Sequence, residues 1–149
     1  YKRQIGAIGQ SIPFELGLAM AQPDLRILLF TGDGDTLMSL GSIATVANHP
    51  VTNLTIVVMD NESYVETGSQ PTATAGKTDL EIVAKGSGIS NSYTIKNEKD
   101  YDRLIKTIYE EEGPSLVVAK CKAKATPLVF PYSFDGSVSI HRFMSTLKS

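Results

Sequence analysis

The sequence predicts an α/β fold: a doubly wound parallel sheet with helices on both faces. Two apolar runs, residues 26–31 and 54–59, have the continuous hydrophobicity of buried parallel strands. A Gly-Asp-Gly turn follows the first run, and a helical pattern over residues 36–49 leads to the second. Strands and helices that alternate in this way form parallel sheets. We therefore expect one domain over residues 1–149.

Each of the other predicted elements has a local signal. Residues 11–21 form a helical pattern with Pro13 in the first turn, where proline is tolerated. Residues 61–77 are rich in Gly, Thr and Ser, and we expect a long polar loop there. The elements that follow are a short helix over 79–85 capped by Thr78 or Asp79, a weak strand over 92–95, an amphipathic helix over 100–112, a strand over 115–121 and a terminal helix over 139–147.

The helix expected over residues 100–112 carries its apolar residues at helical spacing, so we expect one face of it to be apolar. Gly113 and Pro114 follow and end the pattern. The predicted apolar face comprises Tyr101, Leu104, Ile105, Ile108 and Tyr109.

Composition excludes several classes of function. The net charge is −2 with a pI of about 5.7, and no basic stripe with aromatic residues is present, so we expect no nucleic-acid partner. No apolar run approaches about 20 residues, so we expect no membrane span. The single Cys121 lies in a strand pattern and predicts a packed thiol. One cysteine without a signal-peptide pattern indicates a cytoplasmic protein.

Polar residues follow both predicted strands. Asp33 stands in the turn after the first strand, where we expect it to face solvent, and Asn61 follows the second strand. The carboxyl ends of neighbouring parallel strands form the ligand-binding edge of α/β folds. Gly32 and Gly34 allow the backbone to approach a phosphate, and Asp and Asn oxygens are ligands for Mg²⁺. A Gly-Asp-Gly turn alone would be an ordinary turn, but its pairing with Asn61 across one strand–helix–strand unit predicts a metal-bound diphosphate.

The segment from Gly32 to Asn61 resembles the metal–diphosphate signature of thiamine diphosphate enzymes. Downstream, Thr67-Gly68-Ser69-Gln70-Pro71-Thr72 and residues 76–80 resemble the decarboxylases of sulfopyruvate and phosphonopyruvate, and residues 38–45 are similar to the same branch. The resemblance covers nearly the whole chain. It implies the diphosphate-binding domain of a 2-oxoacid decarboxylase, with thiamine diphosphate and Mg²⁺ as cofactors, releasing CO₂ and an aldehyde.

The resemblance also implies roles for individual residues. The metal ligands would be Asp33, Asn61 and the backbone carbonyl of Ser63. Ile8 would support the bent cofactor, although a core position is the alternative. Asp35 would cap the helix after the turn and lie beside the diphosphate. The remaining cofactor and catalytic candidates lie on the loop that borders the thiazolium, with loop structure as the alternative: Tyr64, Thr67 and Gln70.

Two glutamates depart from the decarboxylase pattern. Glu62 stands where the branch has glycine, and Glu66 replaces a small or polar residue. A carboxylate near the reaction centre would repel an anionic substrate. We expect both glutamates to face solvent.

The resemblance further implies a partner. In the family a second, pyrimidine-binding domain supplies a glutamate, and that domain is absent from this chain, so we expect a partner subunit or domain and an oligomer, either a dimer or a hetero-tetramer. The expected interface lies around Ile5, Ile8, Ile12 and Phe14. Three alternatives share the fold: an acetolactate synthase-like carboligase, a 2-oxoacid oxidoreductase subunit and a non-catalytic subunit.

Overall fold

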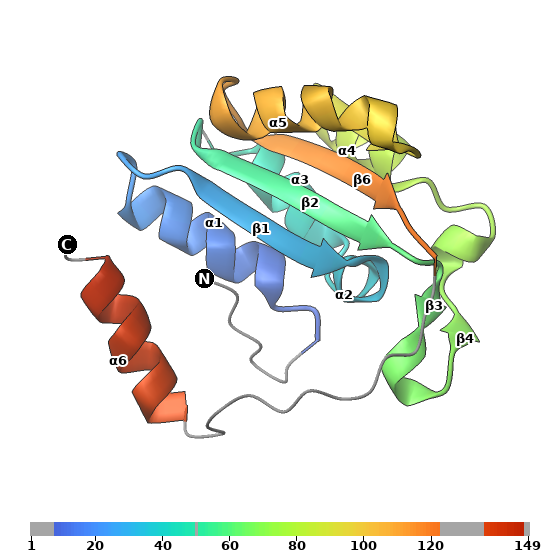
Figure 1. Cartoon of the computed structure of the whole chain (residues 1–149), viewed down its shortest axis with the longest axis horizontal. Helices are drawn as coiled ribbons and strands as arrows, with labels where there is room; N and C mark the ends of the chain where they lie inside the picture. The colour runs from blue at the N-terminus through green and yellow to red at the C-terminus, as the bar shows by residue number, and fades with distance from the viewer. Residues whose placement is uncertain (1–7, 50, 123–135, 148–149) are drawn as a thin grey trace.

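The computed structural model describes residues 8–49, 51–122 and 136–147. Its main feature is a four-stranded sheet in the order β1-β2-β6-β5, with every pair parallel (Figure 1). The strands are β1 (Ile27–Gly32), β2 (Leu54–Asp60), β5 (Asn91–Ile95) and β6 (Ser115–Lys120). The predicted parallel α/β sheet is therefore confirmed.

The strand register brings distant residues to one edge of the sheet. Gly32 at the end of β1 lies opposite Met59 of β2, and Asp60 at the end of β2 lies opposite Lys120 of β6. Because the strands are parallel, the residues that follow β1, β2 and β6 all emerge at this carboxyl edge.

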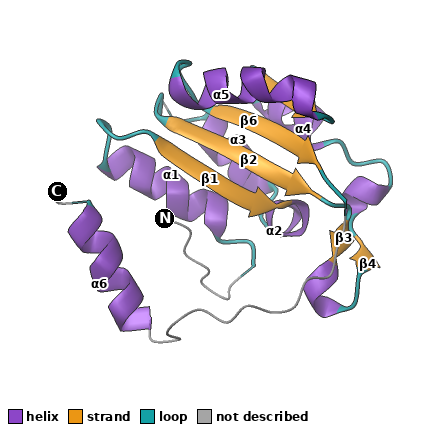
Figure 2. Cartoon of the chain, in the orientation of Figure 1, coloured by secondary structure: helices purple, strands orange, loops and turns teal. Residues whose placement is uncertain are grey.

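Helices lie on both faces of the sheet, as predicted (Figure 2). On one face, α1 (Ser11–Ala21), α3 (Gly41–Ala47) and α4 (Leu80–Ser87) enclose the main core. On the other face, α5 (Tyr101–Tyr109) packs through Leu104 against β5 and β6. The largest fully buried apolar side chains are Ile12, Ile43, Leu54, Ile56, Leu80, Ile89 and Leu116.

The single helix predicted over residues 36–49 is wrong. The segment forms two helices, α2 (Asp33–Met38) and α3, separated at Ser39 and Leu40. The amide of Ser39 donates to the carbonyl of Thr36, which closes the first helix with a tight turn, and the amide of Ser42 donates to the carbonyl of Ser39. The break lets α2 begin immediately after β1 while α3 packs into the main core.

The structureless loop predicted over residues 61–77 is also wrong. It contains a small hairpin of β3 (Ser63–Tyr64) and β4 (Gln70–Pro71), with the 3₁₀ turns η1 (Val65–Thr67) and η2 (Ala73–Ala75). The hairpin lies at the carboxyl edge beside the ends of β2 and β6 (Figure 1). Thr72 and Thr74 after the hairpin are buried, so the segment is anchored to the domain.

Burial differs from prediction on the second face of the sheet. Leu28 and Phe30 of β1 are exposed because α5 covers β5 and β6 but not β1.

In α5 the predicted apolar face is only partly correct. Thr107 is buried and its hydroxyl contacts the Tyr93 hydroxyl at 2.8 Å. The helix therefore turns toward the sheet and leaves three of the predicted residues exposed: Tyr101, Ile105 and Tyr109.

The remaining elements lie close to their predicted positions. Asp79 caps α4 by accepting a hydrogen bond from the amide of Ile82, and the left-handed Gly88 ends the helix. The 3₁₀ turn η3 (Glu98–Asp100) leads into α5, and α6 (Gly136–Thr146) is the predicted terminal helix. Cys121 lies beyond β6 and is exposed, so the prediction of a packed thiol is wrong.

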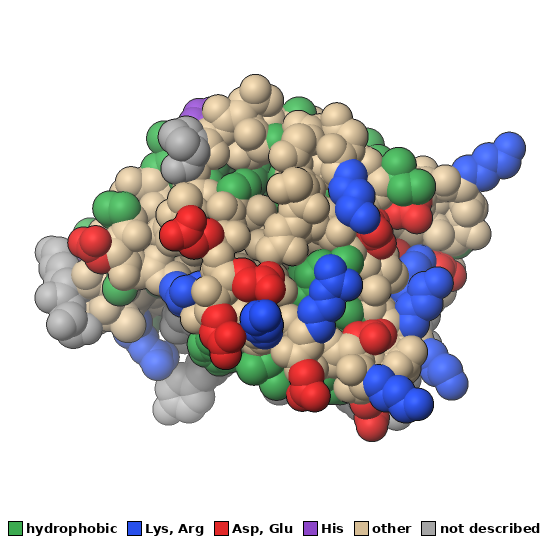
Figure 3. Space-filling model, turned by 90° about the horizontal axis from the view of Figure 1, so that it is seen from above, with side chains coloured by type: hydrophobic (Ala, Val, Ile, Leu, Met, Phe, Trp, Pro, Cys, Tyr) green, Lys and Arg blue, Asp and Glu red, His purple; other side chains and the backbone are tan. Residues whose placement is uncertain are grey.

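Charged side chains of both signs are mixed on one face of the molecule (Figure 3). On the face shown in Figure 3, acidic and basic side chains lie next to one another rather than in separate patches. Within the described ranges, none of the helices combines the length and apolar character needed to cross a membrane.

Candidate functional site

Asp33 begins α2 and lies at the carboxyl edge, but it does not face solvent as predicted. Its side chain is only 2% exposed. Its Oδ2 accepts hydrogen bonds from the hydroxyls of Thr72, at 2.6 Å, and Thr74, at 3.1 Å. The Thr72–Thr74 segment thus covers Asp33, which explains the burial.

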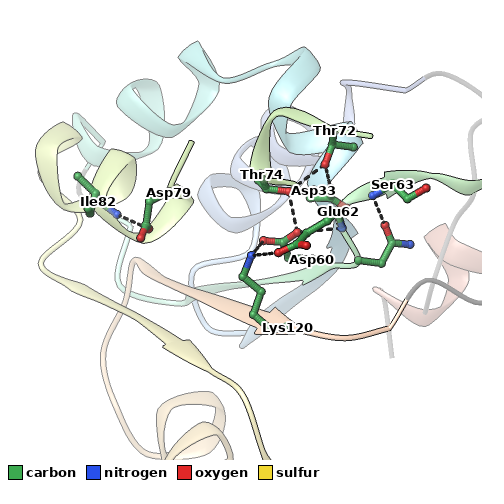
Figure 4. A network of polar contacts seen from close by, with 10 residues as sticks. Asp33, Asp60, Glu62, Ser63, Thr72, Thr74, Asp79, Ile82 and Lys120 are labelled. Atoms are coloured by element: carbon green, nitrogen blue, oxygen red, sulfur yellow. Dashed lines mark hydrogen bonds and ion pairs between the residues drawn. The ribbon is translucent and has the colours of Figure 1, made fainter. Parts of the chain in front are cut away.

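A second buried carboxylate, Asp60, stands beside it and was not predicted. Asp60 is 1% exposed, and its Oδ1 accepts from the Thr74 hydroxyl at 2.8 Å. Its Oδ2 lies 2.8 Å from the ammonium of Lys120, which also contacts Glu62 at 2.7 Å (Figure 4). Glu62 and Glu66 are both exposed, as expected, although Glu62 also forms an ion pair with Lys120.

The two threonine hydroxyls link the two carboxylates. Each hydroxyl has one proton, yet the Thr74 oxygen contacts both Asp33 and Asp60, and it lies 2.9 Å from the Thr72 oxygen. Within the described part of the chain, every side-chain hydrogen bond of Asp33 uses Oδ2. Its Oδ1 is therefore the oxygen that remains for another ligand.

Asn61 and Ser63 form the next part of the site. The Asn61 Oδ1 accepts from the Ser63 amide at 2.9 Å, across Glu62 in the left-handed region with φ 60°. Ser63 lies opposite Pro71 in the hairpin, and Glu62 accepts from the Thr72 amide. Hydrogen-bonded and non-hydrogen-bonded pairs alternate in an antiparallel ladder. The Ser63–Pro71 pair is the non-bonded kind, so the Ser63 carbonyl points away from β4.

The three predicted catalytic candidates all lie on the hairpin. The Tyr64 ring packs against Gly34, because a Cβ on that glycine would lie 2.4 Å from the Tyr64 Cε1. Thr67 and Gln70 are exposed and bond to each other, with the Gln70 amide donating to the Thr67 carbonyl at 2.9 Å. Tyr64 therefore lies directly against the glycine turn.

Asp35 does not cap α2, contrary to prediction. Its carboxylate accepts hydrogen bonds from the Gly9 amide, at 2.5 Å, from the Ser11 hydroxyl and from the Thr31 hydroxyl, at 2.5 Å. The Asp35 carboxylate therefore connects the turn before α1 with the end of β1 through hydrogen bonds. Ile8, next to this turn, is 47% exposed, so the alternative of a core position is wrong.

The expected interface residues differ in exposure. Ile12 is fully buried in the core and cannot take part in an interface, whereas Phe14 is partly exposed on α1. The Phe14 ring lies 6.3 Å from the ring of Phe143 in α6. Ile5 lies outside the described residues.

Charges at the carboxyl edge perturb two neighbouring groups. Partial desolvation lowers the pKa of Lys120, but the hydrogen bonds and charges of Asp60 and Glu62 outweigh it, so the pKa lies above its usual value. Desolvation raises the pKa of the Cys121 thiol, and the charges of Asp60 and Asp33 raise it further. Lys120 thus lies among carboxylates at this edge, with Asp60 and Glu62 as its ion-pair partners.

Comparison with known proteins gives the family. A model described as "Thiamine pyrophosphate enzyme, C-terminal TPP binding domain" matches residues 2–119. The chain belongs to this family. The matched range contains Asp33, Asn61 and the whole hairpin.

Two of the named relatives are decarboxylases. The chain is 31% identical over 138 residues to sulfopyruvate decarboxylase subunit beta of Methanocaldococcus jannaschii, covering 87% of this chain and 72% of that subunit. It is 34% identical over 113 residues to phosphonopyruvate decarboxylase of Streptomyces viridochromogenes, covering 76% of this chain and 28% of that protein. The predicted resemblance to this branch of the family is confirmed.

Solved structures of thiamine diphosphate enzymes share the fold. A thiamin diphosphate-dependent enzyme from Mycobacterium smegmatis aligns with a TM-score of 0.68 and 25% identity, covering 79% of this chain and 23% of that chain. A thiamine diphosphate-dependent 4-hydroxybenzoylformate decarboxylase from Rhodococcus jostii aligns with a TM-score of 0.62 at 17% identity, covering 81% and 24%. The predicted thiamine diphosphate-binding fold is confirmed.

The oxygens at the edge fit a magnesium-bound diphosphate in this family. Among the described residues there is no group of three or more His, Cys, Asp or Glu side chains arranged to hold a metal. A set of one carboxylate, one amide oxygen and one carbonyl, with phosphate oxygens completing the shell, suits Mg²⁺, which rarely uses an all-protein cage. The free Asp33 Oδ1 and the Ser63 carbonyl that points away from β4 meet this requirement.

Proposed function

We propose that this chain binds thiamine diphosphate through Mg²⁺ and forms half of the active site of a 2-oxoacid decarboxylase of the sulfopyruvate or phosphonopyruvate type. The observation that carries the proposal is the Asp33 carboxylate next to Asn61 and Ser63. One of its oxygens contacts two threonine hydroxyls, and the other has no side-chain partner among the described residues. The named decarboxylase relatives supply the reaction class.

Each residue of the site has a defined task in this proposal. Asp33, the Asn61 side-chain oxygen and the Ser63 carbonyl hold the Mg²⁺. Gly32 and Gly34 border the diphosphate, and Tyr64 against Gly34 forms the adjoining wall. When bound, thiamine diphosphate supplies the electron sink for decarboxylation. The exposed Thr67 and Gln70 face the substrate side and help to exclude water.

A partner completes the site in this proposal. Two of the relatives are beta subunits, a name that implies another subunit in those proteins. The exposed Ile8 and Phe14 supply apolar surface beside the glycine turn for a pyrimidine-binding subunit or domain. A dimer or hetero-tetramer would then bring a small 2-oxoacid to a site between two domains.

One alternative has support of its own. The chain is 28% identical over 139 residues to the large subunit of acetolactate synthase isozyme 1 of Escherichia coli, covering 24% of that subunit. A carboligase would use the same metal site. We favour decarboxylation because the beta-subunit relatives are matched over about three quarters of their length.

Titration with thiamine diphosphate tests the cofactor site. Asp33→Ala should abolish the Mg²⁺-dependent part of the binding measured by calorimetry, and Asn61→Ala should weaken it, because a neutral ligand contributes less. Asp102→Ala, at an exposed position on α5, is the control and should bind as the parent does. Unchanged affinity in Asp33→Ala would remove this residue from the metal site and leave a non-catalytic subunit as the better interpretation.

Turnover tests the need for a partner. The chain alone should not release CO₂ from sulfopyruvate or phosphonopyruvate, and addition of a pyrimidine-binding subunit should restore release. Robust turnover by the 149-residue chain alone would contradict the half-site proposal. Formation of a carbon–carbon bond between two 2-oxoacids would favour the carboligase.

A further inference from the structure

A continuous line of polar contacts connects β6 with α2. Lys120 lies 2.8 Å from Oδ2 of Asp60, and Oδ1 of Asp60 accepts from Thr74 at 2.8 Å. The Thr74 hydroxyl lies 3.1 Å from Oδ2 of Asp33, where the Thr72 hydroxyl also donates (Figure 4). Four separate elements of the chain thus meet through these side chains, of which only Asp33 is a proposed metal ligand.

We propose that Lys120 is a positioning residue for the metal site. It holds Asp60, which fixes the Thr74 and Thr72 hydroxyls on one oxygen of Asp33 and so directs the other oxygen at the cation. The inference deepens the proposed function and rests on it, because it requires Asp33 to bind Mg²⁺.

Burial explains why this arrangement needs Lys120. Asp60 is almost completely buried, and a buried carboxylate is stable only with charged or hydrogen-bonding partners. Besides Lys120, the described residues offer it the Thr74 hydroxyl and the Glu62 amide, the latter at 3.2 Å. Without the ammonium, Asp60 would lose its charged partner, and the Thr74 hydroxyl that contacts both Asp60 and Asp33 would no longer be held in place.

Simple electrostatics predicts the opposite effect on metal binding. Lys120 is a positive charge close to a site for a dication, so its removal should strengthen binding if charge repulsion dominates. Loss of positioning should weaken binding, since residues that orient metal ligands typically contribute about 10–100-fold in affinity. The sign of the change therefore distinguishes the two mechanisms.

The experiment measures the binding of Mn²⁺, a spin probe for Mg²⁺, to the full chain in the presence of thiamine diphosphate. Electron paramagnetic resonance reports the free Mn²⁺. Lys120→Met should weaken binding by about 10-fold or more, and Lys120→Arg should restore most of it. Lys85→Met is the matched control, because Lys85 pairs with Glu81 on the surface of α4, and it should bind as the parent does. Equal or tighter binding by Lys120→Met would overturn the proposal.

Two further substitutions test whether Lys120 acts on Asp33 through Asp60 and Thr74. Thr74→Val keeps the shape but removes the hydroxyl and should weaken Mn²⁺ binding as Lys120→Met does, whereas Thr74→Ser should retain it. Glu62→Gln removes the other partner of Lys120 and should leave affinity within about twofold, because the Asp60 contact persists. A loss in Glu62→Gln equal to that of Lys120→Met would show that Lys120 acts through Glu62, which overturns the route through Asp60.

The parent chain separates this proposal from the one on which it rests. If the parent binds no Mn²⁺, or if Asp33→Ala binds it equally well, the proposed function fails. If the parent binds, Asp33→Ala does not, and Lys120→Met binds like the parent, only the positioning role fails. Thermal melts of every variant confirm that the comparison is made between folded proteins.

Discussion

The Tyr64 ring occupies the space that a side chain at Gly34 would need. A Cβ at position 34 would lie 2.4 Å from the Tyr64 Cε1 and 2.8 Å from its Cδ1. Glycine at this position is therefore required by a neighbour from the hairpin, and not only by the turn of its own backbone.

Substitution at Gly34 should displace Tyr64. We expect Gly34→Ala to destabilise the domain by about 1 kcal/mol, the lower end of overpacking costs, because the half-buried ring can move aside. Urea denaturation measures the change. In a Tyr64→Ala background the same substitution should cost less, and purely additive effects of the two changes would show that the ring does not oppose the new methyl group.

Gly113 should be far less tolerant. A Cβ there would lie 2.4 Å from the Leu54 carbonyl oxygen, a backbone atom at the start of the buried strand β2. We expect Gly113→Ala to cost about 3 kcal/mol, the upper end for overpacking, since the backbone of β2 cannot move without disturbing the sheet. In the control Gly86→Ala the new Cβ meets no atom within 4 Å outside its chain neighbours and the backbone of its own helix, so stability should rise by up to about 1 kcal/mol from helix propensity. Equal stabilities of the two variants would contradict the steric argument.

The charge of the Asp33 carboxylate should lower the free energy of unfolding when the cofactor is absent. Asp33 and Asp60 are buried and share the Thr74 hydroxyl, so neutralising one should relieve their repulsion. We expect Asp33→Asn to stabilise the cofactor-free protein by roughly 1 kcal/mol, or about 2–4 °C in Tm. It should also remove any rise in Tm on addition of Mg²⁺ and thiamine diphosphate.

Asp35→Asn on the same helix is the control. The Asp35 carboxylate accepts from Gly9, Ser11 and Thr31, so its neutralisation should lower the Tm. A lower Tm in Asp33→Asn as well would mean that the threonine contacts outweigh the repulsion.

The Glu111 carboxyl should make the free energy of unfolding depend on pH in the acid range. Hydrogen bonds from Asn91, at 3.0 Å, and Thr107, at 2.9 Å, hold the pKa of the Glu111 carboxyl below its usual 4.5. A lowered pKa in the folded state gives stability that is complete above pH 4.5 and is lost as the pH falls through the folded value. Glu111→Gln should therefore flatten the fall in unfolding free energy below this pH, measured by urea denaturation. The exposed Glu112→Gln should flatten it less, and equal effects would contradict the assignment.

Much of the fold could be predicted because its signals are local. The apolar runs of β1 and β2 and the cap of α4 by Asp79 are each visible within a few residues of sequence. The break between α2 and α3 could not, because Ser39 and Leu40 carry no strong helix-breaking signal. The orientation of α5 depends on the Tyr93 hydroxyl of β5, on the same face of the sheet, which local periodicity does not reveal.

The site was predicted in part for the same reason. Asp33 and Asn61 carry a recognisable spacing, whereas the support around them depends on the register of distant strands. Asp60 meets Lys120 only because β2 and β6 pair in one particular alignment. The only sequence signal for Asp60 was its position immediately before Asn61. Asp60 nevertheless looked like the last residue of an ordinary strand.

The shortness of α2 has a mechanical consequence. Six residues move as one piece, and this helix carries Asp33 at its start and Asp35, tied to Gly9, in its first turn. Any displacement of Asp33 is therefore transmitted to the turn that carries Ile8. The position of the turn that carries Ile8 and the placement of the Asp33 side chain are therefore coupled through α2.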